Sequence, residues 1–289
     1  MEKVDCIICS SKKSELIINV TDRLSKEKKL YNIVKCKNCS FIFLNPRYNS
    51  MEIKPFYDAK AYDPHRKTFE SIYTVLYSFV QYFTMYWKYR IIRRYFSKGS
   101  VLDIGGGNGK FVQFMNGKGW QATLQDSYAP IKNINKKYNF VKELSELKNK
   151  KFDLITLWHS IEHIHDQDIL FKNIEDLLNK NGILMIAAPN IHAIEKKYFK
   201  ENWVAYDAPR HLYHFDLQTI NKLCNNKNFK IIKSYSLIQD TAHNILLSLK
   251  DYSIKQVIYG LIIFLSTISK ILYRGPKYSS SFLIICKRL

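Results

Sequence analysis

The stretch that decides the fold reads VLDIGGGNG and occupies residues 101–109. Its apolar beginning, Val101 to Ile104, predicts a short buried strand, and a helical pattern from Phe111 to Lys118 follows. Between them, three alternating glycines let the backbone turn sharply and approach a ligand closely, at a helix N-terminus that favours a carboxylate. A turn of the NAD type would carry its third glycine one residue later, as GxGxxG. The stretch therefore predicts a nucleotide-binding turn of a different kind.

Predicted strands and helices alternate on both sides of this turn. Further buried strands are expected at Ala122–Gln125, around Phe140–Leu144, and at Phe152–Trp158, Ile183–Ala188, Phe229–Tyr235 and Ser281–Cys286. Such alternation predicts an α/β fold with a parallel, doubly wound sheet. We assign this domain to residues 98–289, with a substrate loop at 190–216 and an apolar helical insertion at 241–276.

Two apolar segments flank or interrupt this domain. Residues 46–97 are expected to be a helical linker or lid, because apolar side chains recur at helical spacing at Phe69, Ile72, Tyr73, Leu76, Val80, Phe83 and Trp87. That aromatic stripe fits core packing, a lid or a lipid-facing surface. The segment 254–273 has a charge-free stretch between Lys255 and Lys270 that is short for a bilayer, so we expect a buried or interfacial helix.

An acidic residue follows the second predicted strand. Asp126 stands where a carboxylate can accept hydrogen bonds from both hydroxyls of a ribose. Together with the glycine turn it resembles motif I of the class I S-adenosylmethionine (SAM) dependent methyltransferases. The resemblance implies a Rossmann-like seven-stranded sheet and SAM as cofactor, held by Asp103, Gly105, Gly107 and Asp126. It places the adenine near the end of the third strand, at Glu143 and Leu144.

The segment after the fourth strand reads WHSIEHI, residues 158–164. It resembles the corresponding motif of polyprenyl-quinol O-methyltransferases, whose residues line the pocket between SAM and acceptor. Trp158, His159, Glu162 and His163 lie where an open α/β sheet binds ligands. The string HxxEH also occurs in zinc peptidases, but there both histidines belong to one long helix, not to a loop after a strand. A role of Glu162 and His163 in capping the next helix stays open.

The loop after the fifth strand is rich in aromatic and titratable residues. Its DAPRHLYHF, residues 207–215, resembles a signature of bacterial methyltransferases with an N-terminal four-cysteine module, many from gene sets for surface polysaccharide and sugar modification. We expect His159 or His211 to act as the general base. His163, His214 and Arg210 are expected to orient the acceptor or to pair with its phosphate or carboxylate.

Four of the six cysteines form two CxxC pairs within residues 1–45, Cys6 with Cys9 and Cys36 with Cys39. This spacing predicts a zinc ribbon whose tetrahedral site has no open position, and hence structural Zn²⁺. Unliganded thiols or a redox pair are the alternatives. The N-terminus lacks the apolar core of a signal peptide, so we expect a cytoplasmic protein.

The chain of 289 residues carries a formal net charge of +20. Such a balance favours anionic partners, although the lysines are dispersed and fit a general compositional bias as well. We predict a SAM-dependent methyltransferase acting on oxygen or carbon of a small-molecule, sugar or lipid-linked glycan acceptor, with peripheral membrane contact. An RNA methyltransferase is less favoured because no dense basic stripe is present. A catalytically idle SAM-binding adaptor is the second alternative, and the oligomeric state is left open.

Overall fold

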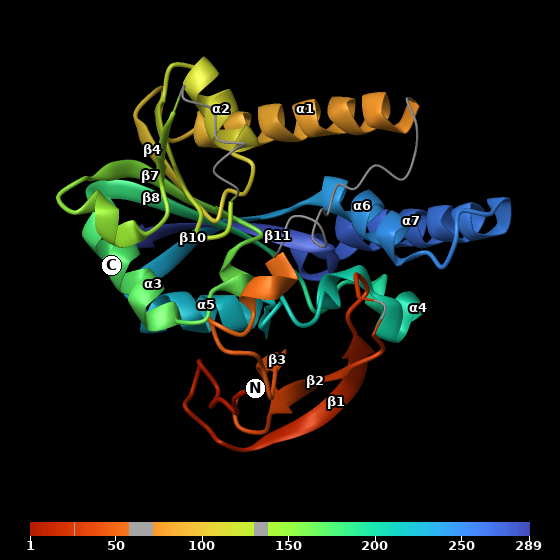
Figure 1. Cartoon of the computed structure of the whole chain (residues 1–289). Helices are drawn as coiled ribbons and strands as arrows, with labels where there is room; N and C mark the ends of the chain where they lie inside the picture. Colours follow the sequence, from red (N-terminus) through yellow and green to blue (C-terminus); the bar gives the residue numbers. More distant parts are fainter. Residues whose placement is uncertain (26, 58–71, 130–137) are drawn as a thin grey trace.

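The computed structural model describes residues 1–25, 27–57, 72–129 and 138–289. In this part of the chain a central sheet carries helices on both faces, and a second, smaller sheet lies below it (Figure 1). The helix expected from the spacing of Phe69 to Trp87 is present as α1 (Ile72–Ile92), while Phe69 and the side chains of residues 72–81 lie outside the described part of the chain.

The central sheet has seven strands in the order β10-β11-β8-β7-β4-β5-β6. Their bounds are Phe229–Ser236 (β10), Ser281–Arg288 (β11), Leu178–Pro189 (β8), Phe152–Trp158 (β7), Ser100–Ile104 (β4), Gln121–Gln125 (β5) and Asn139–Val141 (β6). The α/β prediction is confirmed. The expectation of a parallel sheet needs one correction, because β11 runs antiparallel to both β8 and β10. The chain returns from the last helix in the opposite direction and inserts β11 between them.

Helices cover both faces of this sheet (Figure 1). Besides α1, their bounds are Lys110–Gly117 (α2), Gln167–Leu177 (α3), Lys196–Phe199 (α4), Leu217–Asn226 (α5), Ile238–Ser248 (α6) and Ile254–Arg274 (α7). Strand side chains alternate between two cores: Leu154 packs with the α1 and α2 side, and Ile155 with the α3 and α5 side. Both faces of the central strands are therefore buried, as a doubly wound fold requires.

The small sheet joins the N-terminal module to the loop after β8. It has the order β1-β2-β3-β9, with bounds Ser14–Thr21 (β1), Leu30–Cys36 (β2), Ile42–Leu44 (β3) and Tyr213–His214 (β9). Phe43 pairs with Tyr213 in this sheet, and Phe41 packs 5.4 Å from Phe215 between ring centroids. Residues 1–45 are thus built into the same core as the larger domain and are separate from it only along the chain.

Two long helices extend beyond the sheet on its right side in Figure 1, α1 and α7. The end of α1 is buried at Ile91 and Ile92, whereas its Phe83 is 55% exposed. In α7 a narrow side is buried, with Ile263 at 1% exposure, and Gly260 lets α6 approach closely enough that an added Cβ would lie 3.1 Å from Ile245. Trp87, the last residue of the stripe, packs against the core, so the stripe serves core packing at this end, and α7 is a surface helix.

Candidate functional site

The glycine turn connects β4 to α2 and is fixed by the neighbouring strand ends. Gly105 donates its N–H to the carbonyl of Gln125 at 2.8 Å, and Gly107 donates its N–H to Asp126 Oδ2, also at 2.8 Å. Gly105 has φ +68°, and a Cβ there would lie 2.6 Å from Cβ of Ser160. Only glycine fits this position. The turn, the end of β5 and the loop after β7 therefore meet at the carboxyl edge of the sheet, where α/β folds bind ligands.

The Asp126 carboxylate is held at the end of β5 by backbone amides. Its Oδ1 accepts the N–H groups of Tyr128 and Ala129, each at 2.8 Å, in addition to the Gly107 bond to Oδ2. A carboxylate has about four acceptor positions, so about one is left for a ribose hydroxyl. A bond to both hydroxyls, as the sequence predicts, requires one of these amides to give way.

The predicted adenine end lies at the tip of β6. Gln125 Nε2 donates to the carbonyl of Lys142 at 2.7 Å, which ties the ends of β5 and β6 together. Glu143 is exposed and donates its N–H to Glu146 Oε1 at 2.8 Å, while Leu144 is partly buried against the core. Their contact with adenine stays a prediction.

A buried charge network lies behind the turn. Asp103 is 1% exposed and accepts the Thr156 hydroxyl at 2.6 Å, and burial raises the pKa of Asp103 to about 7. Lys88 of α1 places its ammonium 3.9 Å from the centre of the Trp158 ring. Burial lowers the pKa of Lys88 to about 8, against the attraction of Asp103 and Asp240. The sequence reading missed Lys88, although it is the single charged residue between Ile72 and Tyr89.

Trp158, expected to contact the cofactor, ends β7 on the same side. Its ring packs edge to face on Phe111, the second residue of α2, at 5.5 Å between centroids. Its buried indole N–H has no hydrogen-bond partner among the described residues. A buried donor without a partner costs free energy and marks this wall as one that a ligand with an acceptor atom can complete.

His159 follows β7 in the left-handed region, with φ +54°. Its Nε2 lies 2.9 Å from Asp240 Oδ2, a residue of α6 that the sequence reading did not identify. Burial opposes a charge on His159, but Asp240 and Glu162 outweigh it and raise the pKa of His159 to about 10. An imidazolium has no lone pair for a proton. This geometry disfavours His159 as the general base, so His211 remains the expected base.

Glu162, His163 and His211 form a cluster on the other side of this network. One ligand atom from each lies within 4.8 Å of the other two, and the two imidazole centroids are 4.6 Å apart. Burial, together with His211, lowers the pKa of His163 to about 4, so that its ring is neutral. His214 lies nearby, with its ring 6.5 Å from that of His211, and its buried Nε2 has no partner in the described part of the chain. The structure therefore brings all four predicted histidines together, since His159 also lies next to this cluster, 3.7 Å from Glu162 between Nδ1 and Oε1.

Arg210 holds this region instead of facing a ligand. It is 1% exposed, and it donates to both carboxylate oxygens of Asp207 (2.7 and 3.0 Å) and to both of Asp22 (2.8 and 3.3 Å). Asp22 follows β1, so the bonds tie the N-terminal module to the loop that carries His211. Four donors are occupied by these carboxylates, which leaves Arg210 little capacity for the acceptor phosphate expected from the sequence.

Tyr57 links the two sides of the site. Its ring stacks on Tyr128 at 4.5 Å between centroids, next to Asp126, and its hydroxyl lies 2.9 Å from His163 Nδ1. The residue belongs to the expected linker or lid at 46–97, and its role as a lid stays a prediction.

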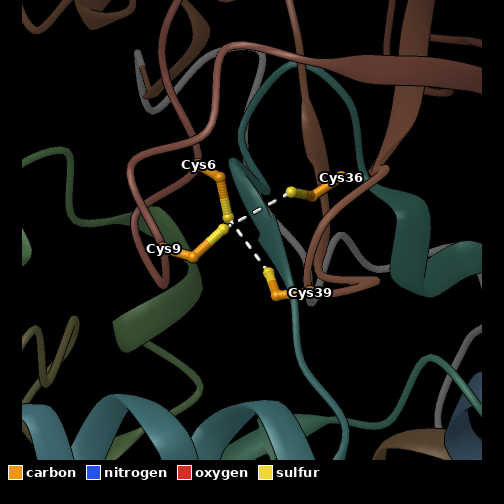
Figure 2. A group of neighbouring side chains, drawn as sticks. All are labelled: Cys6, Cys9, Cys36 and Cys39. Atoms are coloured by element: carbon orange, nitrogen blue, oxygen red, sulfur yellow. Dashed lines mark hydrogen bonds between the residues drawn. The ribbon is translucent and has the colours of Figure 1, made fainter.

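The four predicted zinc ligands converge in the N-terminal module (Figure 2). Cys6 Sγ lies 3.4 Å from Cys39 Sγ, and Cys9 Sγ lies 3.6 Å from Cys36 Sγ. Tetrahedral zinc with Zn–S bonds of about 2.3 Å sets its sulfurs about 3.8 Å apart. The two distances above are close to this value, and the four thiols are free in the structure, with their sulfur atoms all within 4.8 Å of one another.

Comparison with known proteins adds a family match. The model of a family described as "Methyltransferase domain" matches residues 79–234. No relative is found among curated proteins. Among solved structures, a SAM-dependent methyltransferase from Archaeoglobus fulgidus is 19% identical with a TM-score of 0.48, over 75% of this chain and 100% of that one. A 1,6-didemethyltoxoflavin-N1-methyltransferase from Burkholderia thailandensis is 13% identical with a TM-score of 0.49, over 87% and 97% of the two chains.

Proposed function

The chain belongs to the methyltransferase domain family, and on this premise we propose that it moves the methyl group of SAM to a sugar or lipid-linked glycan. The acceptor atom is an oxygen or carbon, and the product serves surface polysaccharide biosynthesis. One observation carries the proposal: the glycine turn lies directly against Ser160, two residues before Glu162, so donor and acceptor sides adjoin. Family and geometry support methyl transfer, and the resemblance of the 207–215 loop supports the acceptor class.

The donor side has the groups that SAM requires. The turn from Gly105 to Gly109 supplies a backbone cradle, in which only the Cα of Gly107 faces open space, and Asp126 offers its remaining acceptor position to the ribose. Lys88 supplies a cation for the carboxylate of the aminoacyl part, beside the unpaired indole N–H of Trp158. When bound, SAM supplies an electrophilic methyl group on a sulfonium. The chain contributes mainly by holding the acceptor in line with that methyl.

The acceptor side must also remove a proton from a hydroxyl or a carbon acid. We assign this task to the cluster of Glu162, His163 and His211, because its neutral imidazole and its buried carboxylate can accept one. His159 and Asp240 position the loop as an ion pair, and Arg210 positions His211. The N-terminal module, with structural Zn²⁺ on its four cysteines, holds Asp22 against Arg210.

A mass-shift assay tests this function. The full chain is incubated with SAM and a panel of lipid-linked glycans, sugar nucleotides, quinols and RNA, and methylated products are sought by mass spectrometry. We expect methylation in the glycan or sugar members. Methylation of RNA alone, or of no member by protein that binds SAM, would contradict the acceptor proposed.

Matched variants distinguish the role of the acceptor side from that of the donor side. Glu162→Gln and His211→Gln should lower turnover by about 10²- to 10⁴-fold, the usual contribution of acid–base groups, with SAM affinity kept. His192→Gln is the control, because its imidazole pairs with Asp216 at 3.0 Å, away from the cluster.

We further propose that the enzyme works in the cytoplasm against the inner membrane surface. By length and composition, one described helix, α7, is apolar enough to cross a membrane over Ile254–Tyr273, yet only 22% of that window is buried. One side of α7 packs on α6, and we propose that its opposite, exposed face inserts into a lipid surface. No acidic residue occurs from Tyr252 to Leu289, where six lysines and arginines favour anionic lipid.

Flotation with anionic liposomes tests the membrane contact. Wild type should float, and Ile262→Glu with Leu265→Glu should not, since these side chains are 61% and 59% exposed on α7. Ile169→Glu is the control, because Ile169 is equally exposed (60%) but belongs to α3. Wild type that stays in the soluble fraction would overturn this proposal and leave methyl transfer untouched.

A further inference from the structure

We infer that Glu162, His163 and His211 form a divalent metal site on the acceptor side, separate from the four-cysteine centre. The site has two imidazole nitrogens and one carboxylate oxygen within 4.8 Å of one another. The inference deepens the proposed function and rests on it for the role of the ion, but the binding of the ion follows from these residues alone.

Hydrogen bonds to backbone carbonyls orient both imidazoles and fix the tautomer of His211. His211 Nδ1 lies 2.8 Å from the carbonyl of Ala205, and His163 Nδ1 lies 3.1 Å from the carbonyl of Arg210. A carbonyl can only accept, so His211 Nδ1 carries the hydrogen and its Nε2 keeps a lone pair. His163 Nδ1 has a second neighbour, the Tyr57 hydroxyl at 2.9 Å, which can donate or accept; a hydrogen on Nδ1, donated to the carbonyl, leaves the His163 Nε2 lone pair for a metal. This arrangement, with the second ring nitrogen donating to a backbone oxygen, is the usual support of a metal-binding histidine.

The Glu162 carboxylate lacks the partners that a buried anion needs. The residue is 0% exposed, and among the described residues neither carboxylate oxygen accepts a hydrogen bond. The Nδ1 atom of the His159 imidazolium lies 3.7 Å from Glu162 Oε1, beyond hydrogen-bond distance, and the same ring forms a closer ion pair with Asp240 through Nε2. A buried ionised carboxylate is costly unless it is paired or bound to a metal. His159 thus offers Glu162 a charge at 3.7 Å but no hydrogen bond, and both carboxylate oxygens keep lone pairs that a metal ion shared with His163 and His211 can take.

The supports of the three ligands come from distant parts of the chain. Arg210 clamps the loop of His211 through Asp207 and Asp22, and Tyr57 contacts His163 Nδ1 with its hydroxyl at 2.9 Å. Leu212 donates its N–H to the carbonyl of Glu162 at 2.8 Å and so joins the two loops. Ligands held in this way need little rearrangement to close on an ion.

The donor set selects the class of ion. Two nitrogens and one oxygen without thiolate suit Zn²⁺, Fe²⁺, Mn²⁺ or Co²⁺ better than Mg²⁺ or Ca²⁺, which prefer oxygen ligands. Three protein ligands leave positions open for a substrate, as in catalytic sites and unlike the four-cysteine centre. An acceptor hydroxyl on such an ion ionises more easily: its O–H bond breaks, the electron pair stays on oxygen and the proton passes to water. His211 then acts as a ligand, and the ion supplies the activation otherwise assigned to a base.

Cobalt titration tests the site without donor or acceptor. Co²⁺ is added to the zinc-loaded full chain, and its visible absorption is recorded. We expect a single further ion per chain with ligand-field bands and no sulfur-to-cobalt charge transfer. Glu162→Gln and His211→Gln should each weaken uptake by about 10- to 100-fold or more, whereas His192→Gln should bind as wild type does.

Circular dichroism and SAM binding verify that each variant is folded. If Glu162→Gln unfolds, Glu162→Asp replaces it, because aspartate keeps the carboxylate. Glu162→Asp should bind Co²⁺ with an altered absorption spectrum. No absorption in wild type, or uptake unchanged in folded Glu162→Gln and His211→Gln, would overturn the metal site. Loss of methyl transfer with intact Co²⁺ uptake would instead count against the proposed function alone.

Discussion

The donor side and the acceptor side of the site are built in opposite ways. The donor side is mostly backbone from residues 100–129: a glycine turn, the amides that hold Asp126 and the ends of β4 and β5, to which Lys88 and Trp158 add side chains. The acceptor side is mostly buried side chains, and its members come from β1, the linker, the loop after β7, the 207–214 loop and α6. The donor side keeps its shape through local chain geometry, whereas the acceptor side depends on buried charges that must be paired across the molecule.

This difference predicts where the molecule is most sensitive. Buried ion pairs are expensive to break, because the remaining charge has no water around it. Strain in a turn costs less but acts directly on the bound cofactor.

The largest effect is expected from Arg210→Met. It leaves the carboxylates of Asp22 and Asp207 buried without their cation, which should lower the free energy of unfolding by about 3–5 kcal/mol. The control is Arg288→Met, which removes an exposed bridge to Glu175 and should cost no more than about 1 kcal/mol. Urea denaturation measures both. Equal losses in the two variants would contradict the role of Arg210 as the clamp of the acceptor side.

The same pair predicts an acid limit of stability. Burial opposes the charge of Asp207, but Arg210 outweighs it and lowers the pKa of Asp207 from 3.8 to about 2. A depressed carboxyl pKa stabilises the fold above the unfolded value and loses this effect as the pH falls through the folded value. The free energy of unfolding should therefore fall from pH 4 toward pH 2 in wild type, and less in Arg210→Met. Identical slopes would show that Asp207 does not use this ion pair.

Gly105→Ala tests the donor side by itself. The left-handed conformation costs a residue with a Cβ about 1–2 kcal/mol, and the contact with Ser160 adds to this. We expect loss of SAM binding with the acceptor-side Co²⁺ site intact. Gly117→Ala is the matched control, since no atom lies within 4 Å of an added Cβ at this helical position. It should bind SAM normally and gain up to about 1 kcal/mol of stability. Normal SAM binding by Gly105→Ala would contradict the cradle.

The smallest effect concerns the helix that follows the acceptor loop. Asp216 caps α5 by accepting the N–H of Thr219 at 2.7 Å. Asp216→Ala should cost about 1 kcal/mol, and Asp216→Asn less, because asparagine also caps helices. Thermal unfolding measures the loss of stability in both variants. A fall in turnover as well would show that Asp216 has a wider role than capping α5.

The same contrast between local and distant contacts explains which parts of the structure could be predicted from the sequence. The strand, turn and helix around Asp103 to Gly109 follow from local periodicity and glycine spacing, and the central sheet, apart from the direction of β11, matches that reading. The cysteine spacing likewise predicts a cluster that the structure brings together.

Pairings between distant segments could not be read in this way. Nothing local to Asp22 or Asp240 indicates that they meet Arg210 and His159, because each lies in an ordinary strand end or helix. For the same reason His159 and His211 are equal candidates for the general base from the sequence alone, and the contact of His159 with Asp240 distinguishes them. Lys88 had a usable signal, a single charge within an aromatic helix.

Calorimetric titration with S-adenosylhomocysteine, the demethylated donor, tests the central claim most directly. We predict saturable uptake by wild type, and for Asp126→Asn a loss of about 1.5–3 kcal/mol of binding free energy, as expected for a hydrogen bond to a charged group. The cradle formed by the glycine turn and Asp126 would be contradicted by wild-type protein that is folded and takes up none of this ligand, or by Asp126→Asn that binds it as tightly as wild type.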